Sequence, residues 1–202
     1  YEIRFCDWSS DVCSSDLLMI ERGPAAVRDY LSQLDLGGVP ASDLLTAAQV
    51  SVTAGDYRLA EQLTARAVAA ADFPEVELAH RTAIKWGTSH ELLLALLELH
   101  NSDRQAAVER VTGLLRLIDE LERNGYATWG IHSLRADALG LLGDADGAMR
   151  SLQQAVDAGW RSAWAAQRDP YLVSLFERPD FRELMQRVEQ LNADERRRYL
   201  RF

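Results

Sequence analysis

The sequence predicts an all-α fold: an α-solenoid of helical hairpins that ends in a helical C-terminal cap. The chain is rich in Ala and Leu, and hardly any stretch alternates Val, Ile, Thr or Tyr with polar residues. This composition favours helices over strands. Gly and Pro recur along the chain and divide it into segments of helix length, as expected for helices joined by tight turns.

Each expected helix is bounded by residues that start or stop helices. Thr88 with Glu91, and Ser102 with Gln105, have the spacing of a capping box and each opens a helix. The expected helices cover residues 24–34, 41–54, 57–71, 75–86, 88–100, 102–123, 128–142 and 145–158. Asp169-Pro170 and Pro179 are expected to begin two more short helices, and residues 194–202 to form a polar tail.

One turn recurs in the sequence. Gly55-Asp56 and Gly143-Asp144 are each followed by a small residue, and another alanine comes seven residues after it. Because seven residues make two helical turns, both small residues face the same side and allow close helix packing. The pattern predicts helical hairpins that cannot bury their inner faces alone and must stack on neighbours.

These residues resemble the tetratricopeptide repeat (TPR) family. The matches are Ala48, Gly55, Asp56, Tyr57, Ala60 and Ala67 in residues 41–74, and Ala136, Leu139, Gly143, Asp144, Ala148, Leu152 and Ala155 in residues 129–162. A third, degenerate copy centres on Ser102-Asp103 with Ala107, Val111 and Leu114. The turns lie 47 and 41 residues apart, whereas the family repeats every 34 or so. Longer helices, or an extra helix at 75–86, account for this difference.

The C-terminal segment has its own character. It resembles the end of repeat regions that follow winged-helix or nucleotide-cyclase domains in bacterial regulators and signalling enzymes. An open solenoid end exposes apolar helix faces, and five large side chains are available to cover them: Trp160, Trp164, Tyr171, Leu175 and Phe181. We therefore expect TPR-like repeats over residues 18–158 and a cap with a polar tail over 159–202.

Residues 1–17 resemble a translated sequencing-library adapter, since Asp7 to Asp16 back-translate into an adapter sequence in one frame. Native sequence is then expected from Leu18. Both cysteines of the chain, Cys6 and Cys13, lie in this segment, so no disulfide is expected. We further expect that deleting residues 1–17 leaves stability unchanged. The native gene should continue upstream of Leu18 with more hairpins and a separate domain.

No catalytic or metal-binding motif emerges from the sequence. His90-Glu91 and His100 have the outer spacing of a zinc-protease motif, but Leu94 and Leu97 stand where its second histidine and its glycine belong. Neither a Gly-rich phosphate loop nor a nucleophile elbow is found. The sequence thus predicts no enzyme, no metal and no cofactor. The net charge is −9, of which −3 lies in residues 1–17; the acidic balance that remains argues against nucleic-acid binding. No transmembrane run is present after residue 17.

The predicted function is a protein-interaction or sensing scaffold in the cytoplasm that binds a protein or peptide. The resemblance places its binding residues on the concave face, at Gln49, Thr53, Ser133 and Asp137. Gly140 would leave room there for a ligand backbone. The alternative is the C-terminal regulatory arm of a nucleotide cyclase or a winged-helix regulator, which upstream sequence would reveal. The basic run 196–198 is expected to complement a helix dipole, or else to contact an anion or membrane surface.

Overall fold

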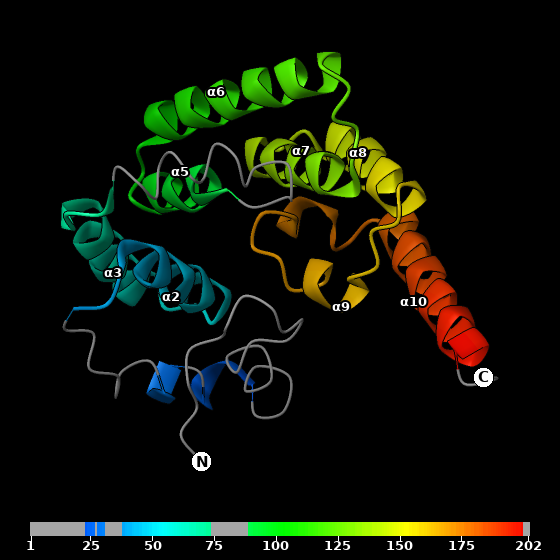
Figure 1. The fold of residues 1–202 in the computed structure, drawn as a ribbon, viewed down its shortest axis with the longest axis horizontal. Coiled ribbons are helices and arrows are strands. Elements are labelled where there is room, and N and C mark those ends of the chain that lie inside the picture. The colour runs from blue at the N-terminus through cyan, green and yellow to red at the C-terminus, as the bar shows by residue number, and fades with distance from the viewer. Residues whose placement is uncertain (1–22, 27, 31–37, 74–88, 200–202) are drawn as a thin grey trace. The chain divides into compact units, whose positions relative to one another are not determined.

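The computed structural model describes residues 23–26, 28–30, 38–73 and 89–199 (Figure 1). In this part of the chain every regular element is a helix and no strand occurs, which confirms the all-α prediction for these residues. The adapter-like residues 1–17 and the helix expected at 75–86 lie outside the described residues. The chain divides into two compact units, Tyr1–Val76 and Glu77–Phe202, which are described separately below.

The first unit contains the hairpin of α2 (Ala41–Thr53) and α3 (Tyr57–Ala69). The two helices pack against each other along their length. Their facing sides are apolar and buried, with Leu44 and Val52 from α2 and Leu63 from α3 each at most 3% exposed. Burial of this shared face stabilises both helices, because neither is long enough to be stable alone.

The second unit contains two hairpins and the elements that follow them. The hairpins are α5 (His90–His100) with α6 (Arg104–Arg123), and α7 (Trp129–Leu142) with α8 (Ala145–Asp157). Both α5 and α6 contact α7, so the second hairpin packs on the first through α7 (Figure 1). After them come α9 (Ala163–Ala166), the 3-10 turn η2 (Val173–Leu175) and α10 (Pro179–Tyr199).

All three hairpins share one turn geometry. A residue with positive φ comes first: Gly55 at 78°, Ser102 at 66° and Gly143 at 83°. The aspartate that follows caps the next helix with its side chain, which accepts a hydrogen bond from the amide three residues on at 3.0, 3.1 and 2.9 Å. Its own amide donates to the carbonyl five residues back at 2.8, 2.8 and 2.9 Å. A tight turn therefore lies at Ser102-Asp103, but Asp103 caps the following helix and not Ser102, which the capping-box spacing had predicted.

Small residues occupy matching places around these turns. The alanines eight residues before the capping aspartate, and those four residues after it, are at most 1% exposed: Ala48, Ala95 and Ala136 before, Ala60, Ala107 and Ala148 after. Ala95 completes the pattern in the middle hairpin, although the sequence analysis did not single it out. A methyl side chain at these sites allows the two helices of a hairpin to approach closely.

The C-terminal cap packs on the last hairpin. Leu172, Leu175 and Phe181 share one buried core with Ala148 and Leu152 of α8. The predicted covering residues Tyr171, Leu175 and Phe181 are all buried. Trp160 is partly buried against this core, and Trp164 is partly exposed with the guanidinium of Arg168 4.8 Å from its ring centre.

Two details of the cap differ from the expectation. The helix expected after Asp169-Pro170 is only the single turn η2. The polar tail expected from residue 194 is instead the end of α10, which continues to Tyr199. Polar contacts along the helix explain the extension: Asp194 accepts from Gln190 at 3.1 Å and also pairs with Arg197. The arginines 196–198 lie in the last turn, where positive charge complements the helix dipole.

Candidate functional site

The four site residues predicted from sequence form two pairs, one in each unit. Gln49 and Thr53 lie one turn apart on α2 and are partly buried. The Thr53 hydroxyl donates a hydrogen bond to the carbonyl of Gln49 at 3.1 Å. Ser133 and Asp137 lie one turn apart on α7. The structure thus brings the members of each pair together on one helix.

The α7 pair does not form an open polar surface. Ser133 is only 9% exposed, and its hydroxyl donates to the carbonyl of Gly130 at 3.1 Å. Asp137 is partly buried. The Ser133 hydroxyl is therefore hydrogen-bonded within its own helix and is not available to a ligand.

The space beside Gly140 is filled by the chain's own cap. A Cβ at Gly140 would lie 2.5 Å from the carbonyl oxygen of Tyr171 and 3.2 Å from Cδ2 of Leu172. The hydroxyl of Ser174 donates to the Gly140 carbonyl at 3.4 Å. A backbone does approach Gly140 closely, as the sequence suggested for a ligand, but in this structure the backbone belongs to residues 171–172.

Asp137 on α7 interacts with Asp169, which precedes η2. Both side chains keep some exposed surface, but protein atoms crowd their carboxyl groups. This desolvation, with the nearby charge of Asp169, raises the pKa of Asp137 well above its ordinary value. Desolvation also raises the pKa of Asp169 to about 6, although a hydrogen bond from the amide of Tyr171 at 2.9 Å opposes the rise. The two carboxyl groups therefore lie in poorly solvated surroundings, where the ionised form of Asp169 opposes the ionisation of Asp137.

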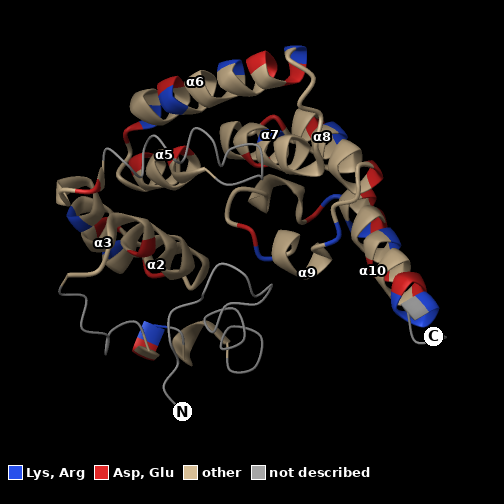
Figure 2. Cartoon of the chain, in the orientation of Figure 1, with Lys and Arg blue, Asp and Glu red and all other residues tan. Residues whose placement is uncertain are grey.

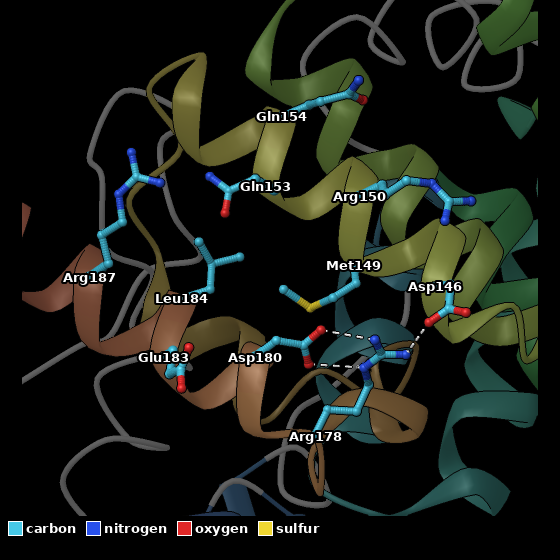
Figure 3. Close-up of a pocket in the computed structure, with 10 residues that line it drawn as sticks. All are labelled: Asp146, Met149, Arg150, Gln153, Gln154, Arg178, Asp180, Glu183, Leu184 and Arg187. Carbon is cyan, nitrogen blue, oxygen red and sulfur yellow. Dashed lines mark hydrogen bonds and ion pairs between the residues drawn. The ribbon is translucent and has the colours of Figure 1, made fainter.

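A groove of about 720 Å³ lies between α8 and α10 (Figure 3). Met149 and Leu184, both mostly buried, supply its apolar lining. The polar lining comes from both helices and from the loop before α10: Asp146, Arg150, Gln153, Gln154, Arg178, Asp180, Glu183 and Arg187. Eight of its ten lining residues are therefore polar or charged, so the groove is more polar than a typical small-molecule pocket.

Arg178 holds one end of this groove together. Its guanidinium binds Asp146 of α8 at 2.6 Å and Asp180 of α10 at 2.9 and 3.0 Å (Figure 3). Arg187 pairs with Asp157 at 3.1 Å. Among the ion pairs that the described residues form, none includes Arg150. Arg150 is exposed, so its charge is the one most available to a ligand.

The sequence alone does not predict this groove. Its residues come from helices about thirty positions apart, and only the fold brings them together. A partial signal was present: Asp146, Arg150 and Gln153 recur at helical spacing on the polar side of α8, opposite the buried Ala148 and Leu152. That pattern marks an exposed helix face but does not reveal what lies beside it.

Other ion pairs join α5 to α6 within their hairpin, and α6 to α7 of the next hairpin. Arg110 of α6 binds Glu91 and Glu98 of α5 at 2.7 and 2.6 Å. Arg135 of α7 binds Asp119 and Glu122 of α6 at 2.6 and 2.8 Å. Figure 2 shows charges of both signs spread along α6 and α10. Within the described ranges no group of three or more potential metal ligands gathers.

No helix in the described part of the chain is long and apolar enough to cross a bilayer. Comparison with protein-family models, with curated proteins and with solved structures finds no match.

Proposed function

We propose that the chain is a non-catalytic interaction scaffold of the tetratricopeptide type, with a protein or peptide as its partner. A turn that occurs three times in the chain supports this proposal. Its three copies, Gly55-Asp56, Ser102-Asp103 and Gly143-Asp144, share one hydrogen-bond pattern. Buried alanines flank each copy. Hairpins of this kind stack as repeats into a solenoid, whose extended surfaces bind other chains.

The groove between α8 and α10 is the proposed binding surface. The side-chain amides of Gln153 and Gln154 can hydrogen-bond to a peptide main chain, which has both donors and acceptors. Met149 and Leu184 offer an apolar patch for one side chain of the partner. Arg150 can pair with a carboxylate. These features suit a short peptide segment with an apolar residue close to an acidic one.

A random-peptide display library selected on the immobilised full chain tests the proposal. We expect enriched peptides to pair an apolar residue with an acidic one and to bind with a Kd of roughly micromolar size. Arg150→Glu should weaken their binding about tenfold or more, since it places like charges together.

Arg116→Glu is the matched control, because Arg116 is also an exposed helical arginine, on α6 and outside the groove. Its peptide affinity should equal that of the parent chain. A library without enrichment would contradict the scaffold function. Equal losses in the two variants would contradict the groove as its site.

A further inference from the structure

The groove between α8 and α10 is bounded at both ends by ion pairs that join the two helices. At one end Arg178 binds Asp146 of α8 and Asp180 of α10 (Figure 3). At the other end Arg187 of α10 binds Asp157, the last residue of α8, at 3.1 Å. Asp146 and Asp157 are eleven residues apart on one helix, which sets the distance between the two ends at about 16 Å.

This length suits an extended segment of about five residues, because each residue of an extended chain adds about 3.3 Å. A helix of the same length would have about eleven residues, and its amides and carbonyls would already be paired with each other. An extended segment leaves its main-chain groups available to the side-chain amide of Gln154, which is an exposed part of the lining. The groove therefore suits an extended occupant better than a helical one.

Two charges of the lining remain outside the ion pairs that the described residues form, one on each wall. Arg150 lies on α8, four residues after Asp146, and Glu183 lies on α10, three residues after Asp180. Both are exposed, and none of the ion pairs includes either of them. Each therefore lies about one helical turn from the Arg178 end, on opposite sides of the groove.

These two charges define which occupant is complementary to the groove. The charges at the two ends are already paired within the protein, so a ligand would have to separate them before it could bind to them. Arg150 and Glu183 incur no such cost. An occupant with an acidic group for Arg150 and a basic group for Glu183 complements both walls. An occupant with charge of one sign only would meet a like charge on one wall, which disfavours it.

We propose that the groove binds an extended segment of about five residues that carries both charges, an acidic side chain at Arg150 and a basic one at Glu183. An apolar side chain of the segment lies over Met149 and Leu184, which are between the two walls (Figure 3). The inference rests on the proposed scaffold function and adds the second charge to it. Glu183 is thus a specificity-determining residue of the groove.

Charge reversal at Glu183 tests the second charge. Peptides are selected from a random library on the immobilised full chain, and an enriched peptide is synthesised with lysine and with glutamate at its basic position. Titration calorimetry measures the Kd of both forms. We expect the parent chain to bind the lysine form about tenfold or more tightly than the glutamate form, and Glu183→Lys to reverse this preference.

Glu189→Lys is the matched control, because Glu189 is also an exposed glutamate of α10 but does not line the groove. It should keep the preference of the parent chain. Reversal in Glu189→Lys as well would overturn the inference, since the overall charge of α10 would then set the preference.

The outcome of the selection also separates this inference from the scaffold function. Enriched peptides that lack a basic residue, and that bind equally to the parent chain and to Glu183→Lys, would overturn the inference and leave the scaffold function in place. A library without enrichment would contradict the scaffold function and this inference with it.

Discussion

Ser102 takes in the middle hairpin the backbone position that Gly143 takes in the last one, with φ of 66° against 83°. Each precedes an aspartate that caps the following helix, and each donates its amide to the carbonyl three residues back, at 3.1 and 3.0 Å. Ser102 is the one residue other than glycine with positive φ among those that the structure describes. The middle turn therefore has the same hydrogen bonds as the other two turns, although serine is less suited than glycine to a positive φ.

Ser102→Gly should stabilise the protein by roughly 0.5–1 kcal/mol. Glycine adopts positive φ without the steric cost that a Cβ incurs, and this gain exceeds its larger loss of entropy on folding. Chemical denaturation of the two chains measures the difference. Gly143→Ser is the reciprocal variant and should lose a similar amount. If Ser102→Gly were destabilising, the shared turn geometry would be wrong.

Gly140→Ala should destabilise the protein by about 1–3 kcal/mol, because the added methyl collides with the backbone of Tyr171 rather than with a flexible side chain. Gly113→Ala is the control: Gly113 lies within α6 with nothing near its Cβ position, so the variant should gain up to about 1 kcal/mol. Thermal unfolding separates the two. Equal effects would show that the cap does not press on α7.

Asp137→Asn should make the protein more stable at neutral pH. Because the pKa of Asp137 is raised in the folded state, its ionisation destabilises that state as pH rises from about 4, the ordinary value for aspartate. The variant should be more stable than the parent at pH 7, and the difference should shrink as the pH falls towards 4. Urea unfolding across this range gives the difference. A gain that did not depend on pH would point to packing instead.

Local signals in the sequence predicted the three described hairpins and their turns but not every cap, since Asp103 rather than Ser102 caps α6 and Ser89 precedes α5 without a side-chain cap. The Gly-Asp pairs and the spaced alanines predicted the first and third described hairpins, and Ser102-Asp103 extended the pattern to the middle one, since capping and tight turns depend on a few adjacent residues. The length of α10 was not predicted. Side-chain pairs such as Gln190 with Asp194 stabilise its last turns, and the polar composition of this segment alone does not distinguish the end of a helix from a non-helical tail.

The candidate sites depended on long-range packing, which one sequence does not show. Gly140 was expected to leave room for a ligand backbone, but the chain's own Tyr171, about thirty residues further along, fills that space. The interaction of Asp137 with Asp169 spans a similar separation. Arg178 likewise joins Asp146 to the start of α10. Each of these contacts exists only because the cap folds back on the last hairpin.

Ala148→Leu should cost about 1–3 kcal/mol, because Ala148 is fully buried in the core that joins α8 to the cap and a larger side chain overpacks it. Asp146→Asn, two residues earlier on α8, is the control. Asp146 is 73% exposed and its pairing with Arg178 is a surface ion pair, so its loss should stay within about 0.5 kcal/mol. Urea unfolding of the three chains gives both values. Near-equal effects would mean that α8 does not present its small residues to the core, and the repeat register would then be wrong.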